Sequence, residues 1–475
     1  MKHDVLLHLP RLFIGLTYRS PPLKAHGWRA ADLSSDELII IVRRGSQRYG
    51  ARVKLQPRIG NPIQMRLLKI AATIFAFAAF GGYACADPVC DGTATTLPTT
   101  DDTAAIQTIL DAGNIFNVPH GKLCKITQSL VITRNDSGLV GDGSGGLYMA
   151  AANFNNTSLA FADRYGTHTV GIYAHGLLAA PWTPLVHPVI KGIRIVSEVQ
   201  QGRSLSAVVV QNATQAKVIG NEIQGFPLGI GIRIQSCVLG CEVAENYIHD
   251  FVDNTTGWAV SSVPQITGVE VDNDIWNNVS SYHVIIRDNT IRNMLVGAAF
   301  LAAYGYQTDC INIARVTTYN TSITGNHLDT CAEGVDNFSI HAIINDNVVM
   351  NTYNFGIKNV HGASFVSVND NTITNYGFAG VLVAGNSQAG DSNVDNIIVS
   401  GNNVSFGNYG GNWGGHDNAA ILVGMNGTTS IPVNIFVTGN ILRPANGEYA
   451  LNITANSGVT VNGNLSFSGT KGISK

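Results

Sequence analysis

Polar and charged side chains recur at one position of a short repeated phrase in the middle of the chain. The phrase is a small residue, an apolar residue, a variable residue and a further residue, as in GIRI, GVEV and GIKN. Its third position is filled in turn by Arg233, Glu270, Asn312, Asp336, Lys358, Leu382, Leu422 and Asn452. If the phrases stack, these residues form one column, which is polar in its first five positions. Carboxylates beside basic groups are the residue types that general acid–base catalysis uses.

Two cleavage chemistries fit this column. Hydrolysis of a glycoside needs two carboxyl groups flanking the bond. Glu270 and Asp336 would lie two repeats apart, roughly 9–10 Å at the spacing of paired strands, near the separation in inverting hydrolases. Elimination instead needs a base beside a uronate, a role open to Lys358, Arg233 or His361. We therefore predict as catalytic residues Glu270, Asp336, Lys358 and Arg233.

Residues beside the column are candidates for substrate binding, because aromatic rings stack on sugars and polar groups bond their hydroxyls. This set is Asp272, Asn312, Trp276, Tyr304, Tyr306 and His361. The oxygens of Asp272, Asp274 and Asp309 would also suit Ca²⁺, so Ca²⁺ is the one cofactor suggested, without a defined metal site. The competing interpretation is structural, since opposite charges on stacked coils, such as Asp336 beside Lys358, often form surface ion pairs worth about 0–1 kcal/mol.

A second repeat predicts the elements that would position the column. Two or three alternating β-branched residues, then Gly-Asn or Asp-Asn, then an apolar residue recur from residue 218 onward; the shared residues are Asn221, Asn246, Asn289, Asn326, Asn347, Asn371, Asn402, Asn440 and Asn464. The shortest intervals, 21–25 residues, indicate one supersecondary unit per repeat. Such a unit cannot bury an apolar face alone, so its neighbours complete the core. Strand-type alternation then predicts an all-β fold, a single-stranded right-handed parallel β-helix. Asn suits its left-handed corners, and the stacked amides can bond to one another.

The start of the folded part has its own pattern. Residues 101–112 are predicted to form a helix, capped by Thr100 or Asp101, that closes the open end of the solenoid. The order DDTAAIQTILDAG, NVPHGK, SLVIT and GLVGDGSG resembles the N-terminal cap and first coils of the pectate-lyase-like superfamily. That superfamily contains pectate lyases, polygalacturonase-type hydrolases, alginate-modifying enzymes and phage tailspikes. The resemblance covers residues 101–146, and the Asn repeats extend it to about residue 468.

The resemblance implies a secreted carbohydrate-active protein that cleaves an extracellular polysaccharide, as a lyase or a glycoside hydrolase, in a groove on the face of the β-helix. The chain departs from the family motifs: it has no paired Asp-Asp after the cap, no Gly-His-Gly, no Asp-Pro-His-Glu and no Arg-x-Pro-x-x-Arg in the central coils. No catalytic residue is therefore carried over. The alternative is a non-catalytic glycan-binding or surface structural β-helix, similar to a tailspike or an adhesin.

Residues 65–86 are typical of a bacterial signal peptide. Arg66 and Lys69 precede an apolar stretch too short to span a bilayer, and Ala-Cys-Ala ends the segment as a cleavage site. A lipidated Cys85 and an uncleaved anchor are the alternatives. The predicted product is secreted, periplasmic or extracellular, with no integral membrane span in the mature chain.

The segment before this signal shapes the predicted domain division. An export signal does not tolerate a long leader, so we expect translation to start at Met65; otherwise residues 1–64 form a disordered basic arm. The predicted domains are 1–64 upstream, 65–86 signal peptide, 87–146 cap and first coils, and 147–475 parallel β-helix. From residue 87 onward, 16 Lys and Arg face 28 Asp and Glu, a net charge of −12. An acidic protein of this kind is a poor partner for nucleic acid, and the predicted partner is a polysaccharide or glycan.

Six cysteines follow the signal, which supports export, and six allow fifteen pairings. Cys310 and Cys331 are 21 residues apart, one coil period, so they could stack at disulfide distance. The remaining predicted pairs are Cys237 with Cys241, closing a small loop, and Cys90 with Cys124, tying down the cap. Metal binding is the rival interpretation, but the chain has no Cys-x-x-Cys and no accompanying His cluster.

Overall fold

The computed structural model divides the chain into two compact units, Met1–Ala84 and Cys85–Lys475. The structure describes residues 4–9, 12–17, 37–44, 47–54, 87–150, 161–163, 166–177, 182–197, 205–226, 229–251, 266–272, 279–294, 308–314, 317–385, 393–411, 418–424, 430–454, 458–467 and 471–474. The predicted signal peptide, residues 65–86, lies outside these ranges, so it stays a prediction.

The first unit contains an antiparallel sheet in the order β1-β2-β3-β4. Its strands are β1 (Asp4–Leu9), β2 (Leu12–Thr17), β3 (Glu37–Arg44) and β4 (Gln47–Lys54). Runs such as ELIIIVRR are rich in β-branched residues, which favour strands. These strands differ from the disordered arm that we considered for residues 1–64. The prediction that this segment is absent from the mature protein stays a prediction.

The second unit is built from three long parallel sheets, to which each complete coil contributes one strand. Sheet I consists, in spatial order, of β10 (Phe161–Asp163), β11 (Gly166–His175), β15 (Leu205–Thr214), β18 (Ile230–Leu239), β21 (Ile266–Asp272), β25 (Thr308–Ile313), β29 (Glu333–Asn337), β32 (Phe355–Asn359), β35 (Ala379–Val383), β38 (Ala419–Val423), β41 (Tyr449–Ile453) and β44 (Ile473–Ser474). Beside this row, β7 (Leu130–Ile132) pairs with β11 and β12 (Leu185–Val186) pairs with β15. Within sheet I only β10 pairs antiparallel among the described strands.

Two further sheets complete each coil. Sheet II contains β5 (Ile115–Asn117), β8 (Gly138–Val140), β13 (Val189–Lys191), β16 (Lys217–Ile219), β19 (Glu242–Ala244), β23 (Ile285–Arg287), β27 (Ser322–Thr324), β30 (Ile343–Asn345), β33 (Ser364–Asn369), β36 (Asp395–Ser400), β39 (Val433–Thr438) and β42 (Val459–Asn462). Sheet III contains β6 (Leu123–Ile126), β9 (Gly146–Met149), β14 (Arg194–Ser197), β17 (Glu222–Gln224), β20 (Tyr247–Phe251), β24 (Thr290–Met294), β28 (His327–Asp329), β31 (Val348–Thr352), β34 (Thr372–Tyr376), β37 (Asn403–Ser405), β40 (Ile441–Arg443) and β43 (Leu465–Ser466). The short pair β22 (Ser281–Tyr282) and β26 (Thr318–Tyr319) and the 3-10 turn η4 (Tyr409–Gly411) lie between coils.

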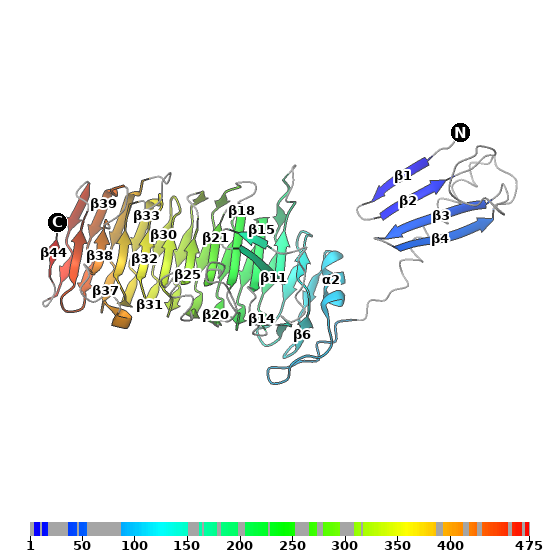
Figure 1. The fold of residues 1–475 in the computed structure, drawn as a ribbon, viewed down its shortest axis with the longest axis horizontal. Helices are drawn as coiled ribbons and strands as arrows, with labels where there is room; N and C mark the ends of the chain where they lie inside the picture. Colours follow the sequence, from blue (N-terminus) through cyan, green and yellow to red (C-terminus); the bar gives the residue numbers. More distant parts are fainter. Residues whose placement is uncertain are drawn as a thin grey trace. The chain divides into compact units, whose positions relative to one another are not determined.

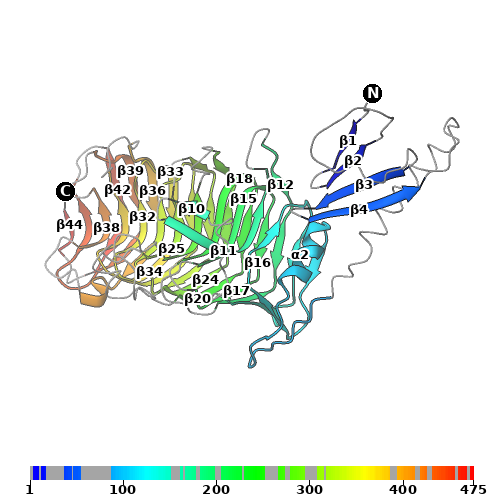
Figure 2. The ribbon, with the colours of Figure 1, turned by 45° about the vertical axis from the view of Figure 1, so that its right-hand side comes forward.

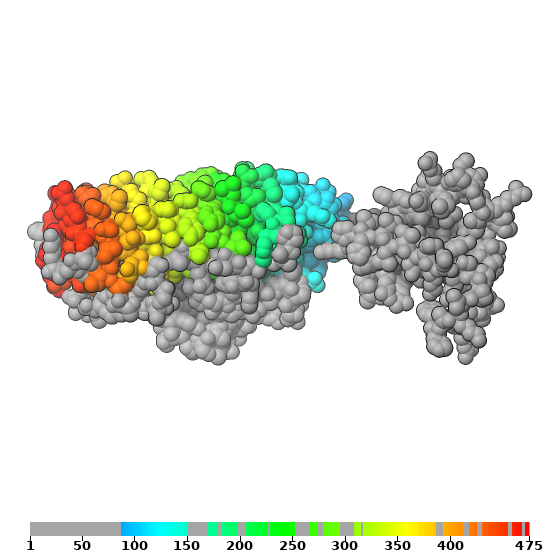
Figure 3. Space-filling model, turned by 90° about the horizontal axis from the view of Figure 1, so that it is seen from above, coloured from blue at the N-terminus to red at the C-terminus, as the bar shows by residue number. Residues whose placement is uncertain are grey.

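Successive coils of the second unit lie side by side in sequence order (Figure 1 and Figure 2), and the same order is visible from above (Figure 3). The core lies between the three sheets, where the inward residues are mainly Ile, Val and Leu. Along sheet I the stacked inward residues Ile232, Val269, Ile311, Val335, Ile357 and Val381 are fully buried. The predicted fold, a right-handed parallel β-helix, is thereby confirmed.

A ladder of buried Asn side chains joins the coils at the corner between sheets II and III. Oδ1 of Asn347 accepts hydrogen bonds from the backbone N (3.0 Å) and Nδ2 (2.9 Å) of Asn326 on the preceding coil. Asn347 in turn donates from N and Nδ2 to Oδ1 of Asn371. The predicted bonding from amide to amide is therefore confirmed. The left-handed backbone, however, belongs to the residue before each Asn, as at Asp346 with φ 56°, rather than to the Asn as we expected.

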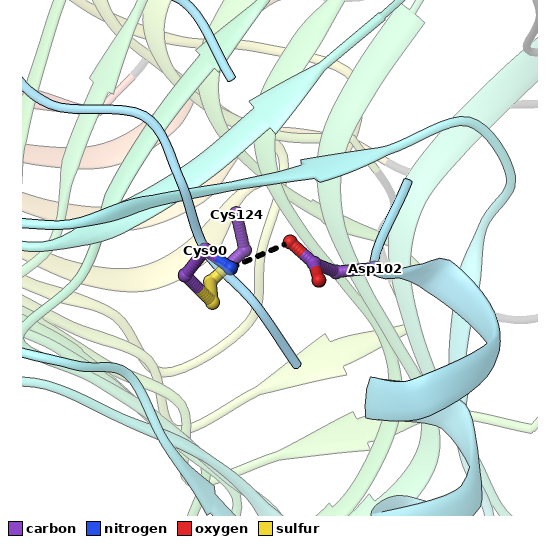
Figure 4. Close-up of side chains that lie close together, drawn as sticks. All are labelled: Cys90, Asp102 and Cys124. Atoms are coloured by element: carbon purple, nitrogen blue, oxygen red, sulfur yellow. Dashed lines mark hydrogen bonds between the residues drawn. A yellow bond between two sulfur atoms is a disulfide. The ribbon is translucent and has the colours of Figure 1, made fainter. Parts of the chain in front are cut away.

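The N-terminal end is closed by α2 (Thr103–Asp111), which buries Thr103, Ile106 and Leu110. The N-cap residue is Asp102, whose side chain makes no capping hydrogen bond, so neither Thr100 nor Asp101 is the cap that we expected. Asp101 does accept a hydrogen bond from the backbone N of Thr103. Asp102 accepts from the backbone N of Cys90 (Figure 4). All three predicted disulfides are present: Cys90–Cys124, Cys237–Cys241 and Cys310–Cys331. Among the described residues, no helix has the length and apolar character needed to cross a membrane.

Candidate functional site

The predicted polar column exists and runs along the outer side of sheet I. Strand pairing aligns Arg233 with Glu270, Glu270 with Asn312, Asn312 with Asp336, and Asp336 with Lys358. The same register continues through Leu382, Leu422 and Asn452. Because the inward neighbours of each residue fill the core, the column faces away from it. Residues more than a hundred positions apart in sequence therefore meet on one flank.

The column is not the open groove that we expected. The exposed fraction is 1% for Arg233, 2% for Glu270, 2% for Asn312 and 5% for Asp336. The side chain of Lys358 is more accessible, at 14%. Alternation along a strand assigns a residue to the outer face of a sheet but does not say what covers that face. For this reason the sequence predicts the alignment correctly and the exposure wrongly.

The first part of the column is an ion-pair group around Arg233. Its Nη2 lies 2.9 Å from Oδ2 of Asp272 and 3.4 Å from Oε1 of Glu270. All three side chains are buried, a state that charged residues almost never reach unless paired. Glu270, which we predicted to be catalytic, and Asp272, which we predicted to bind substrate, are thus both paired with the guanidinium of Arg233.

The second part is a group that we call the lysine–carboxylate cluster: Asp309, Glu333, Asp336 and Lys358. One oxygen from each of the three carboxyls lies within 4.8 Å of the others. Nζ of Lys358 is 2.9 Å from Oε2 of Glu333 and 3.2 Å from Oδ2 of Asp336. Asn312 donates from Nδ2 to Oδ2 of Asp309 at 2.6 Å. The cluster spans the three neighbouring strands β25, β29 and β32.

Burial and mutual repulsion perturb the titration of this cluster. Desolvation raises the pKa of Glu333 to about 7, although Lys358 pulls it back. Desolvation, followed by the negative charges of Glu333 and Asp336, raises the pKa of Asp309 well above its usual value. Burial alone would lower the pKa of Lys358, but the attraction of the three carboxylates outweighs it and that pKa is raised. At neutral pH the cluster therefore combines a charged ammonium with carboxyls that hold protons, which suits both donation and acceptance of a proton.

The sequence analysis considered Asp309 only as a possible Ca²⁺ ligand and did not select Glu333. Both lie three residues before a column position, Asp309 before Asn312 and Glu333 before Asp336, and strand pairing aligns them with each other. Their equal distance of three residues from a column position was the sequence signal that could have identified them. We did not use it, because strict alternation along a strand places residues three positions apart on opposite faces of the sheet.

Among the remaining predicted residues, the structure describes only His361. His361 is half-buried, with its ring 4.5 Å from that of Phe338. Trp276, Tyr304 and Tyr306 lie outside the described residues, as does Asp274. Their roles in substrate or Ca²⁺ binding stay predictions.

Two groups have metal-ligating residue types within reach of one another. Cys90, Asp102 and Cys124 form one, but their sulfurs are joined in a disulfide and Asp102 bonds the backbone, so this group is structural (Figure 4). Asp309, Glu333 and Asp336 form the other, and their oxygens are the ligands that Ca²⁺ prefers. Here the ammonium of Lys358 already contacts two of the three carboxylates, which weakens the fit to a divalent cation.

Beyond Lys358 the outer face of sheet I becomes apolar. A separate buried cluster contains Phe338, Phe355, Val360, Ala379, Leu382, Ala384, Ala419 and Leu422. Nζ of Lys358 lies 5.8 Å from the centre of the Phe355 ring. The lysine–carboxylate cluster therefore lies between the buried charged groups and a buried apolar cluster on the same side of sheet I.

Comparisons with known proteins give likeness in structure only. No protein-family model matches the chain, and a search of curated proteins finds no match. Among solved structures, the chain is similar to the surface protein and adhesin PfbA of Streptococcus pneumoniae, with 12% identity, a TM-score of 0.45, and 79% of this chain and 96% of that chain covered. It is also similar to a family 28 exopolygalacturonase of Yersinia enterocolitica, with 10% identity, a TM-score of 0.42 and coverage of 92% and 83%. An alginate lyase from Paenibacillus matches with 14% identity, a TM-score of 0.37 and coverage of 78% and 96%.

These likenesses do not assign an activity, and the matched proteins include both enzymes and an adhesin. The fold rests on the chain's own three parallel sheets, their continuous register and the Asn ladder between them. On that evidence the chain has the right-handed parallel β-helix fold of the pectate-lyase-like proteins.

Proposed function

We propose that the protein cleaves an extracellular polysaccharide by acid–base chemistry at the lysine–carboxylate cluster. The observation that carries the proposal is the burial of three carboxyls within 4.8 Å of one another around a single lysine. Burying ions is costly, and apolar residues of similar volume are often as stable or more so. Stability alone therefore gives little reason for this cluster, whereas perturbed titratable groups are typical of functional sites.

The roles follow from charge and access. Glu333, with a pKa of about 7, is the proton donor to the departing oxygen. Asp336, whose side chain keeps 7% exposure, is the carboxylate that acts on the substrate, as base in elimination or as nucleophile in hydrolysis. Lys358 holds both carboxyls in place, and Asp309, whose pKa burial raises well above its usual value, keeps a second proton in the cluster. Glu270 and Arg233, which we predicted as catalytic, would line the neighbouring part of the site.

The proposed location is outside the cytoplasm. Three disulfides form in the described part of the second unit, and structural disulfides persist in oxidising compartments. A polymer too large to enter a cell is the substrate that an exported solenoid meets.

A second function, glycan binding without cleavage, is favoured by one observation. Arg233, Glu270 and Asp272 are buried to a degree that suits a structural ion-pair group. In that case the outer face of sheet I would support a binding surface and the cluster would serve only to fix the strands.

Cleavage assays on the full-length protein separate the two functions. The substrates are pectic, alginate and bacterial exopolysaccharides, with new reducing ends and the ultraviolet absorbance of unsaturated uronates as readouts. Glu333→Gln and Asp336→Asn should each lower turnover by roughly 10²–10⁴-fold, the usual contribution of a positioned acid or base. The matched control is Glu242→Gln, which breaks an ion pair with Arg287 on sheet II and should leave turnover unchanged. Polymer binding without any cleavage would instead establish the second function.

A further inference from the structure

Both basic side chains on the outer face of sheet I are already shared between carboxylates. Arg233 contacts Asp272 and Glu270. Lys358 contacts Glu333 and Asp336. These two are the only Lys or Arg residues in the described strands of sheet I. Each of these two cations is therefore already paired with two carboxylates.

The charge on this face is therefore negative. Strands β18 to β32 contribute five carboxyls, namely Glu270, Asp272, Asp309, Glu333 and Asp336, against two cations. Even with two of these carboxyls protonated, one negative charge remains. Among the described residues of these coils, Arg287 and Arg292 belong to β23 of sheet II and β24 of sheet III, and Arg287 is bonded to Glu242.

A negative site of this kind is unsuited to uronate sugars. Elimination requires that the uronate carboxylate be neutralised, so that the adjacent proton can be removed by a base. The described site has no cation to spare for that task, and a lysine held between two carboxylates keeps its proton. A like charge brought into such a site is repelled rather than bound.

A neutral amide, in contrast, lies within the cluster. Oδ1 of Asn312 has no hydrogen-bond partner in the described part of the chain, although the residue is buried. Buried polar atoms are normally bonded, and an acceptor of this kind matches the hydroxyl group of a sugar. Phe338 and Phe355, in the adjoining buried apolar cluster, add no charge that would favour a uronate.

We infer that the substrate is a neutral polysaccharide and that the reaction is hydrolysis rather than elimination from a uronate. This inference rests on the proposed function of the cluster. In the balanced step, the bond between the anomeric carbon and the leaving oxygen breaks, and Glu333 gives its proton to that oxygen. Carboxyls within 4.8 Å of each other suit the retaining arrangement, so Oδ1 of Asp336, which accepts no hydrogen bond among the described residues, forms a bond to the anomeric carbon as the leaving oxygen departs. Water then displaces Asp336 from the anomeric carbon and gives its proton to Glu333.

The test uses matched polymers that differ only in charge. Alginate, polygalacturonate and an acidic bacterial exopolysaccharide are each compared with their carboxyl-reduced, neutral forms, alongside neutral glucans, galactans and mannans. The full-length protein should release new reducing ends from at least one neutral polymer, without unsaturated product. The acidic form of that same polymer should show a kcat/KM lower by about 100-fold, because its carboxylates meet like charge.

Variants make the outcomes distinguishable. Asp336→Asn should abolish cleavage of the neutral polymer, and the sheet II control Glu242→Gln should not. Unsaturated product from an acidic polymer, lost in Asp336→Asn, would overturn the neutral-substrate inference while leaving the proposed function intact. Absence of cleavage from every polymer would overturn both. Cleavage that persists in Asp336→Asn and Glu333→Gln would remove the cluster as the site.

Discussion

Lys358 lies between Glu333 and Asp336 and can neutralise only part of the charge that β25, β29 and β32 bring together. Burial, and after it this excess of negative charge, keeps protons on the carboxyls at pH values where exposed carboxyls are ionised. In the same column Arg233 meets two carboxylates, whereas Lys358 lies beside a group of three. The two groups thus differ in chemistry although their residue types are alike.

The first prediction at this scale concerns the rate of cleavage. If Glu333 is the proton donor, it must be protonated, and its pKa is about 7. The kcat/KM for polymer cleavage should therefore fall as pH rises through about 7. A pH–rate profile measures this, and a rate that increases across the same interval would exclude Glu333 as the donor.

The second prediction concerns stability. The pKa of Glu333 rises from its ordinary 4.5 to about 7 on folding, so between these values the folded state binds more protons than the unfolded state. Stability must then decrease as pH rises through this window, and the raised pKa of Asp309 acts in the same direction. The melting temperature should be higher at pH 5 than at pH 8. Glu333→Gln should show a smaller difference, and an unchanged difference would contradict the assignment.

The sequence could predict this column but not the cluster. Arg233, Glu270, Asp336 and Lys358 share one place in the repeated phrase, and parallel strands align equal places. Asp309 and Glu333 stand at the ends of their strands, where side-chain direction no longer follows alternation. The burial of these side chains could not be predicted either, because it depends on which residues cover the outer face of sheet I, and no local sequence pattern indicates them.

Among the elements, the corner between sheets II and III has the most regular bonding. Each buried Asn donates to the next coil and accepts from the previous one, so the corner groups are satisfied only by their neighbours. The Asn spacing predicted this arrangement. It did not predict that the residue before Asn would take the strained backbone, as at Glu245 with φ 57°, because Asn is itself tolerant of that conformation.

The loss of stability on replacing one Asn of the ladder should depend on its position. Asn347→Ala removes bonds to Asn326 and Asn371 and leaves buried polar groups unsatisfied, so we expect a loss of about 2–5 kcal/mol in the free energy of unfolding. Asn464→Ala, at the half-buried last rung, should cost only about 1 kcal/mol. Urea unfolding of both variants checks the difference. Equal losses would show that the ladder does not act through burial.

The cap offers a comparison between disulfides. Cys90 and Cys124 are 34 residues apart, whereas Cys237 and Cys241 are 4 apart. A disulfide typically contributes about 2–4 kcal/mol, and more when the loop that it closes is longer. The double variant Cys90→Ser, Cys124→Ser should therefore lower the urea midpoint and speed hydrogen exchange in β5 and β6. The matched variant Cys237→Ser, Cys241→Ser should have the smaller effect, and the reverse order would contradict this account.

For the second unit as a whole, the repeat was enough to predict the architecture. Each coil packs only on its neighbours, so a period near 21–25 residues determines both the strands and their order. The activity could not be predicted at this scale, because the acidic charge of the chain argues against nucleic acid as a partner but does not identify the substrate. The four strands of the first unit were not predicted at all, since no repeat supports them and our interpretation set residues 1–64 aside.

The continuous pairing of every coil with the next has a practical consequence for resistance to proteases. Cutting the polypeptide between two coils would sever one covalent link, yet three ladders of backbone bonds and the Asn stack would still join the fragments. A nicked molecule should therefore migrate as one species on a native gel and as two under denaturing conditions. Such tolerance would suit an exported protein that works among hydrolytic enzymes.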